Sequence, residues 1–247
     1  MAKCSISIKR YTLIALLFCS MRVCTGQVLI SILFGDKLNS DKLEFGLVVS
    51  PTLCNITNID SKYRPALALG LYFNWKLTDR LYFHPEADPK SAFGAAKIPP
   101  YSVGNAGIDS LFEDGDVQRK IKALSLPLLM RYRVTGRWFV EAGPQVDLNL
   151  SVQDIFKAKK DGNELTNTVN VEDQFTRFNV GAAMGLMYRL TSAISSMGLG
   201  IRYYYGFTDI MKTAPGGQHN SAWLLNIYIP IGASKAAAKR EKEHQSS

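Results

Sequence analysis

Apolar and polar residues alternate along much of this chain, and the alternation is clearest between Ile121 and Leu150. There, two arms are joined by the tight turn Thr135-Gly136-Arg137. Because successive side chains of a β-strand point to opposite sides, each arm has one apolar face and one other face. The apolar face of the second arm carries Trp138, Val140, Ala142, Pro144, Val146, Leu148 and Leu150. Such a long arm, apolar on one side and ending in an aromatic residue, resembles a strand that crosses a membrane.

Six further segments show the same alternation, so we predict eight strands in all. These segments are 45–53, 67–75, 81–87, 178–189, 199–207 and 223–229. Eight is an even number and the smallest usual strand count for a membrane barrel.

The links between the predicted strands alternate strictly between short and long. The short links are 76–80, 133–137 and 190–196, and the long ones are 54–64, 87–120, 151–176 and 210–221. Antiparallel up-and-down strands place all short turns at one end of a barrel and all long loops at the other. This regularity is independent of the apolar alternation and indicates the same fold.

The N-terminus has the pattern of a secretory signal peptide. Lys3, Lys9 and Arg10 precede a short apolar run, and small residues follow it near Gly26. We predict a signal peptide over residues 1–26. A permanent anchor helix is disfavoured because the apolar run is too short to span a bilayer.

Three further segments complete the predicted organisation. Residues 27–44 have apolar positions spaced for a short amphipathic helix, so they are predicted to form a helix or an N-terminal arm. Residues 45–232 form the barrel domain. Residues 233–247 are charged and alanine-containing, which is typical of a flexible tail.

A soluble lipocalin-like barrel also alternates, with its apolar face turned inward. Two features favour a membrane barrel instead: the other strand face is rich in small residues with only isolated charges, and the apolar faces tend to end in aromatic residues. We therefore predict an all-β fold, an eight-stranded antiparallel up-and-down transmembrane β-barrel with a short N-terminal helical segment. The predicted location is the cell outer membrane.

The positive charge of the chain does not indicate a nucleic-acid partner. The formal net charge is +8, and removal of residues 1–26 lowers it to +4, since Lys3, Lys9, Arg10 and Arg22 are lost with no acid. The tail carries another part of the excess, so the barrel itself is close to neutral. Only Cys54 remains after the signal peptide, so no internal disulfide is expected.

Five charged residues fall on the predicted inner face: Glu86, Arg131, Glu141, Asp147 and Arg202. An eight-stranded barrel is only wide enough inside for side chains, and an unpaired buried charge is costly. We therefore predict a paired polar network that fills the barrel. The alternative is a path for protons, ions or small solutes lined by the same residues.

The sequence contains no recognisable motif for catalysis or metal binding. The three histidines, His84, His219 and His244, are not spaced as metal ligands, and no phosphate-binding loop or nucleophile elbow occurs. We predict no catalytic residues, no cofactor and no metal. An enzyme assembled from residues far apart in the sequence is the less favoured alternative.

Four stretches resemble the PorT-type outer-membrane β-barrel family of Gram-negative bacteria. They are LPLLMRYR, WFVEAGPQVDLNLS, FHPEADPKSAFG and RYYYGFTDI, and the resemblance covers about residues 42–232. It implies an eight-stranded outer-membrane barrel with no catalytic set to carry over. The namesake of the family serves in protein secretion across the outer membrane. This chain departs from the pattern at its last strand, which ends in Pro230-Ile231-Gly232 without a terminal aromatic residue.

These observations predict a non-enzymatic barrel with a structural or accessory role at the cell envelope, including PorT-like protein secretion. Its expected partners are outer-membrane lipid and envelope or secretion proteins that bind the long loops or the tail. The alternative function is a small-solute or ion channel that uses the interior charges. An outer-membrane enzyme and a soluble binding barrel are less favoured.

Overall fold

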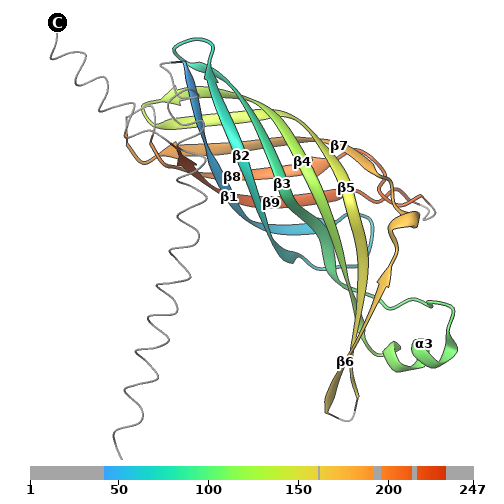
Figure 1. Ribbon diagram of the computed structural model, residues 1–247. Helices are drawn as coiled ribbons and strands as arrows, with labels where there is room; N and C mark the ends of the chain where they lie inside the picture. The colour runs from blue at the N-terminus through green and yellow to red at the C-terminus, as the bar shows by residue number, and fades with distance from the viewer. Residues whose placement is uncertain (1–41, 161, 192–195, 213–215, 232–247) are drawn as a thin grey trace, which may run out of the picture. The chain divides into compact units, whose positions relative to one another are not determined.

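The computed structural model describes residues 42–160, 162–191, 196–212 and 216–231 (Figure 1). Nine strands and two short helices make up this part of the chain. They are β1 (Leu43–Ile56), β2 (Arg64–Lys76), β3 (Leu81–Ile98), α3 (Ala106–Phe112), β4 (Asp116–Thr135), β5 (Trp138–Lys160), β6 (Asn163–Asn170), the 3-10 helix η2 (Glu172–Gln174), β7 (Phe178–Arg189), β8 (Gly198–Gly206) and β9 (Asn220–Pro230). Among the described residues, no helix has the length and apolar character needed to cross a membrane.

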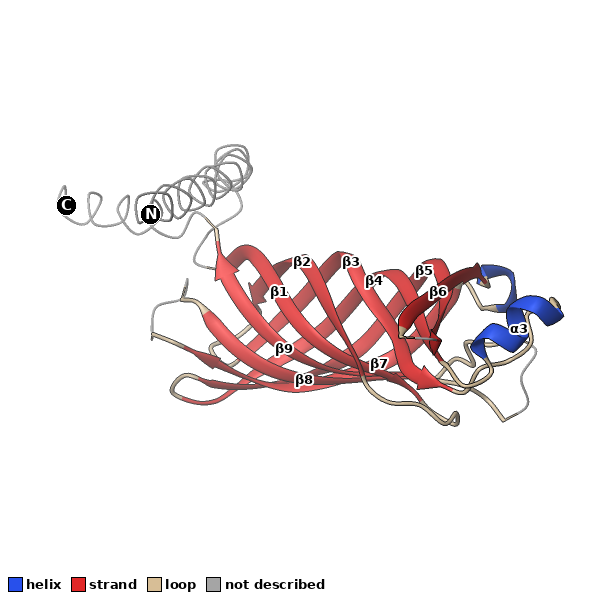
Figure 2. Cartoon of the chain, turned by 90° about the horizontal axis from the view of Figure 1, so that it is seen from below, coloured by secondary structure: helices blue, strands red, loops and turns tan. Residues whose placement is uncertain are grey.

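Eight of the strands close into a ring (Figure 2). Their order is β4-β3-β2-β1-β9-β8-β7-β5, and β4 pairs with β5 to complete the circle. Every pairing is antiparallel. The predicted eight-stranded antiparallel barrel is therefore confirmed. β6 stands outside the ring and pairs only with β5.

The ends of the chain lie mostly outside the described residues. β1 begins at Leu43, inside the segment predicted as an N-terminal arm, so the predicted arm extends slightly too far. The rest of that arm, with its predicted helix, and the predicted signal peptide and tail lie outside the described residues.

All short links lie at one end of the barrel. This end holds the β2–β3, β4–β5 and β7–β8 links, the start of β1 and the end of β9. Gly136 makes the β4–β5 turn with φ of 45°, a left-handed conformation that glycine adopts without steric cost. α3 and β6 lie at the opposite end (Figure 2).

An apolar band surrounds the outside of the barrel. On β4 it runs from Leu124 to Val134, and this stretch of a tilted strand spans about 25 Å, the height of the apolar band of outer-membrane barrels. Exposed aromatic residues border it: Trp75 and Trp138 towards the short turns, and Phe178 and Phe207 towards the other end. The exposed apolar residues on β4, β5 and β7 include Leu126, Leu128, Met130, Tyr132, Val140, Val180, Met184 and Leu186.

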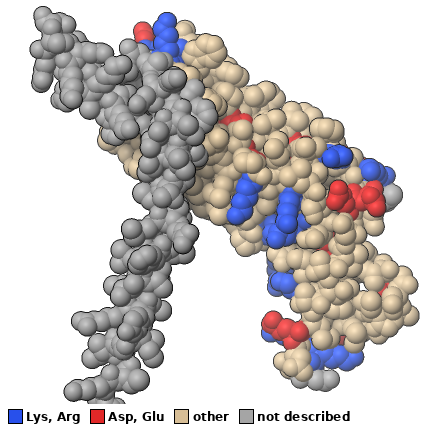
Figure 3. All heavy atoms as spheres, in the orientation of Figure 1, with Lys and Arg blue, Asp and Glu red and all other residues tan. Residues whose placement is uncertain are grey.

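Beyond the band, the outer face of the sheet becomes polar. Lys120 and Lys122 follow Leu124 on the outer face of β4, and Lys157 lies on the outer face of β5. Figure 3 shows basic side chains gathered over this half of the sheet, with largely uncharged surface between them and the short-turn end. The inner face changes in the opposite sense, from polar to apolar, with buried Ile121 and Val152.

This inversion explains where the predicted boundaries were wrong. The segments 87–120 and 151–176 were predicted as long loops, but β3 continues to Ile98, β4 begins at Asp116 and β5 continues to Lys160 before β6. The inversion is marked by a register shift between β4 and β5 near Lys122. Beyond it, the apolar residues face inward in water-exposed strands, so the pattern of a lipid-facing strand stops there. We call residues 91–98, 116–122 and 151–160 together with β6 the wall.

Gly94, within the β3 part of the wall, is predicted to be intolerant of substitution. Its φ is 124°, and a Cβ atom there would lie 2.1 Å from the backbone oxygen of Arg119. Gly94→Ala should therefore lower the free energy of unfolding by about 1–3 kcal/mol, measured by urea titration of the refolded barrel. Gly104→Ala is the control, because Gly104 also has a positive φ, 83°, but no atom lies within 4 Å of its added Cβ. Equal losses for the two variants would contradict the steric argument.

Candidate functional site

The structure brings together four of the five predicted interior residues. Arg202 donates from Nη1 and Nη2 to the two oxygens of Glu86, at 2.6 and 2.7 Å, and from Nε to Glu141 Oε1 at 2.8 Å. Arg131 donates to the other oxygen of Glu141 from Nε and Nη2, at 3.0 and 2.6 Å. Two carboxylates and two guanidinium groups thus alternate in one chain of charge-assisted hydrogen bonds, and their formal charges cancel.

The register of the sheet explains why these groups meet. Arg131 and Glu141 face each other directly across β4 and β5. Glu141, Gly185 and Arg202 lie in one row across β5, β7 and β8. Since Gly185 has no side chain, the guanidinium of Arg202 reaches over it to Glu141. A Cβ at Gly185 would lie 3.2 Å from Cα and 3.3 Å from Cβ of Arg202.

Two further side chains complete this charged core. His84 Nε2 lies 2.8 Å from Glu86 Oε1. The Tyr228 hydroxyl accepts from Arg202 Nη2 at 2.8 Å, and the Arg131 guanidinium stacks 4.8 Å from the centre of the Tyr228 ring. The sequence analysis placed His84 in no metal-ligand set, and its partner here is a carboxylate of the charged core. Tyr228 is not among the predicted interior residues, because a lone tyrosine gives no signal of a charged neighbour far away in the chain.

Asp147, the fifth predicted residue, lies in a separate group. Its carboxylate accepts from Gln145 Nε2 at 2.8 Å and from Asn179 Nδ2 at 3.3 Å, and the Tyr204 hydroxyl donates to it. Asp147 lies six residues after Glu141 on the same inward face of β5. Its partners are nevertheless neutral donors, whereas those of Glu141 are arginines.

A third buried group near the short-turn end has no counterpart in the sequence predictions. Glu44 accepts from the Tyr72 hydroxyl at 2.9 Å and pairs with Arg189 Nη2 at 3.3 Å. Arg189 is the last residue of the predicted strand 178–189, and Glu44 precedes the first predicted strand. β9 and β8 separate β1 from β7 in the sheet, so no pairing of neighbouring strands brings Glu44 to Arg189. The two side chains meet across the interior of the closed ring.

The interior is filled rather than open. The exposed fractions of Glu86, Arg131, Glu141 and Arg202 are 4%, 0%, 3% and 1%. Side chains that line a water-filled pore keep accessible surface, whereas these have almost none. A narrow eight-stranded interior is expected to be filled in this way.

An apolar plug lies above the charged groups, inside the wall half of the barrel. Its buried side chains pack as one cluster, and Phe93 contacts the Tyr204 ring at a centroid distance of 5.4 Å. The plug consists of Cys54, Ile56, Phe93, Ala95, Val117, Ile121, Ala123, Val152 and Phe156, with further members from neighbouring strands. An ion that moved along the barrel axis would have to cross this cluster without hydrogen-bonding partners, which is unfavourable.

The wall carries its own buried ion pair. Arg119 donates to Asp154 from Nε at 2.8 Å and from Nη2 at 2.6 Å, and the Tyr101 hydroxyl donates to the same carboxylate at 2.7 Å. Burial first, and then this hydrogen bond to Asp154, raise the pKa of Tyr101 above its ordinary value. The contact fixes the segment that carries α3 onto the wall.

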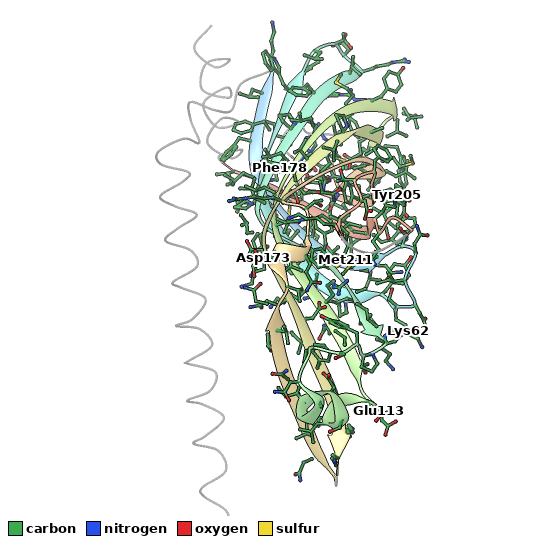
Figure 4. The ribbon with its side chains drawn as sticks, turned by 90° about the vertical axis from the view of Figure 1, so that its right-hand side faces the viewer. Lys62, Glu113, Asp173, Phe178, Tyr205 and Met211 are labelled. Carbon is green, nitrogen blue, oxygen red and sulfur yellow. The ribbon has the colours of Figure 1, made fainter. Side chains whose placement is uncertain are left out.

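The wall extends beyond the rest of the rim. In Figure 4, Glu113 lies well past Lys62, Asp173 and Met211 along the barrel. Beside it, a hollow of about 420 Å³ lies between α3 and Phe156. This hollow was not predicted, because the sequence signal for it is only a run of Pro, Gly and acidic residues.

No metal centre is apparent in the part of the chain that the structure describes, since no three His, Cys, Asp or Glu side chains there are grouped to hold an ion. The charged core contains two carboxylates, but both are occupied by arginine.

Comparison with known proteins identifies the family to which this chain belongs. The model described as "Outer membrane protein beta-barrel domain" matches residues 40–212, which is most of the described chain. No curated protein sequence matches the chain.

Solved structures similar to this chain are outer-membrane barrels of low sequence identity. Ail, the attachment invasion locus protein of Yersinia pestis, is 9% identical with a TM-score of 0.41, over 76% of this chain and 97% of that one. Neisserial surface protein A is 11% identical with a TM-score of 0.37, over 76% and 96%. OprG of Pseudomonas aeruginosa is 15% identical with a TM-score of 0.32, over 76% and 91%.

Proposed function

Because this chain belongs to the outer membrane β-barrel domain family, we propose that it is a closed, non-enzymatic barrel that holds a protein-recognition surface outside the cell. Outer-membrane barrels keep their short turns in the periplasm and their long links outside. In that orientation the short-turn end is periplasmic, and the wall with α3 is extracellular. The barrel anchors the protein in the membrane, and the wall is the surface that binds other proteins.

The observation that carries this proposal is the filled interior. The charged core is neutral in sum and almost fully buried, and the apolar plug lies between it and the exterior. This favours an anchor over the alternative, a small-solute or ion channel that uses the interior charges.

The finer role that we propose is accessory, of the PorT type, in which the barrel assists the secretion or surface retention of other proteins. The length of the wall supports this role, because a rigid sheet outside the membrane is a suitable platform for a polypeptide partner. We further propose that residues 1–26 act as the export signal, and that residues 233–247 provide a contact for envelope proteins.

Conductance measurements test the closed state. The refolded protein in planar lipid bilayers is expected to give no discrete current steps, because neither ions nor water have a path past the charged core and the plug. Folding is verified beforehand by heat-modifiable gel migration of the same sample. As a positive control for the assay, an open porin is inserted under identical conditions. Reproducible steps from the folded protein would contradict the proposal and support the channel.

A further inference from the structure

β6 has one unpaired edge. The strand is hydrogen-bonded to β5 from Gln153 to Lys160, and no other described strand pairs with it. Ring closure removes the strand edges within the membrane-spanning part of the barrel. The other edge of the wall, β3 from Ser91 to Ile98, has only the Lys62–Ala96 bridge on that side and is irregular, with positive φ at Gly94 and Lys97. Figure 1 shows β6 projecting from the end of the barrel that also carries α3. Its outer edge has backbone donors and acceptors that no other described strand pairs with.

The hydrogen-bond pattern identifies which residues face this edge. In an antiparallel pair, alternate residues direct their N–H and C=O groups to the partner strand, and those between them direct theirs away. Just after β6, the N–H of Val171 donates to the carbonyl of Val152 on β5 at 3.1 Å. By alternation, the odd-numbered residues of β6 bond to β5. Thr166 and Thr168 in the centre of the strand, with Glu164 and Asn170 near its ends, face outward.

This edge lacks the features that normally block strand pairing. Natural edges are protected by proline, lysine, bulges or short length. β6 has the sequence NELTNTVN, with no proline or lysine, and its pairing with β5 continues through the whole strand without a register shift. Its only charged residue is Glu164. Because exposed edges are normally protected, the lack of protection favours a binding role for this edge.

The surroundings of β6 define what kind of strand would fit. Leu165 and Val169 are on its inner side, where they pack against the apolar plug cluster, while Thr166 and Thr168 on the outer side are exposed. A strand added to the edge would continue this division, with alternate residues on the apolar side.

We propose that the outer edge of β6 binds an extended segment of another protein by strand addition. The main chain of the segment would bond to Thr166 and Thr168, and apolar side chains at every second position would extend the inner side of β6. This inference rests on the proposed role of the wall as a recognition surface and names its binding edge. It commits to a peptide strand, and pairing of two copies of this chain is a separate outcome of the test.

The test uses the full chain, refolded in detergent, and a phage-displayed library of random peptides as the probe. Peptides selected on the unaltered chain are expected to alternate apolar and polar residues. T166P/T168P should weaken their binding at least tenfold, because proline removes two outward N–H donors and leaves the bonds to β5 intact. T166V/T168V is the matched control, since it keeps both donors, and its affinity should stay within about twofold.

Amide hydrogen exchange on the unaltered chain provides a second readout that does not depend on how the proline variant folds. Binding of a selected peptide should slow exchange at the Thr166 and Thr168 amides, with little change at Leu165 or Asn167, which already bond to β5. Equal binding to T166P/T168P, unchanged exchange at Thr166 and Thr168, or the absence of any enriched peptide would overturn the proposal. Dimerisation of the chain that T166P/T168P abolishes would replace it with self-pairing.

These results separate the inference from the proposed function. A folded, non-conducting barrel without peptide binding at β6 would refute strand addition and leave the closed anchor standing. A conducting barrel would refute the closed anchor whatever β6 binds.

Discussion

Glu141→Gln is expected to lower the free energy of unfolding by about 3–5 kcal/mol, the usual cost of breaking a buried ion pair by removing one partner. The carboxylate of Glu141 accepts from both Arg131 and Arg202, so its loss leaves two buried guanidinium groups with only Glu86 as counter-charge. The amide keeps the size of the side chain, which limits any cavity. Urea titration of the barrel refolded in lipid vesicles, followed by tryptophan fluorescence, measures the change.

The double variant R131M/E141Q provides the control for this prediction. It removes one charge of each sign and leaves the bidentate pair between Arg202 and Glu86, so the interior is neutral again. Its cost should be clearly smaller than the sum of the two single variants, as expected for residues in one network. Costs below about 1 kcal/mol for Glu141→Gln would mean that water screens these charges. That result would contradict the filled interior on which the closed barrel depends.

Leu128→Arg is expected to destabilise the barrel by about 2–4 kcal/mol in lipid, because it places a cation on the outer face near the middle of the apolar band. Leu128 is 43% exposed in the protein alone, so the side chain has room, and the cost comes from the bilayer rather than from steric overlap. The same urea titration in lipid vesicles measures the effect.

Gln118→Arg is the matched control on the same strand. Gln118 lies on the outer face of β4 in the wall, on the same side as Leu128 but beyond the band, where water surrounds the sheet. Its substitution should change stability by no more than about 0.5 kcal/mol. A similar effect at both positions would show that the apolar band does not contact lipid.

Local alternation was sufficient to predict the ring. Each strand that crosses a membrane must be apolar on its outer side, and every short turn must join neighbours, so the hairpin around Gly136 and the alternation of short and long links fixed the strand number and the up-and-down order. The same rule assigned Arg131, Glu141 and Arg202 to the interior, since the period of a strand is two residues.

The wall was missed because its strands lie in water. There the outer face is polar and the inner face apolar, so the pattern of a lipid-facing strand ends at Lys122. One local signal was available: Asp161-Gly162 joins two alternating stretches, and such a pair is a strong hairpin signal. This hairpin signal would have predicted β6. It would not have predicted the free edge of β6, because that depends on which described strands lie beside it in the tertiary structure.

The sequence alone determined which residues face inward, because the side-chain direction of a strand is a local property. The tertiary structure alone decided which of them meet. Arg202 reaches Glu86 and Glu141 from positions distant in the chain, and it does so only because the ring closes with a particular register and Gly185 leaves space between them. Asp147 has the same charge and the same inward direction as Glu141, yet it contacts neutral donors instead. Register and closure are properties of the whole barrel, so no local pattern encodes these partners.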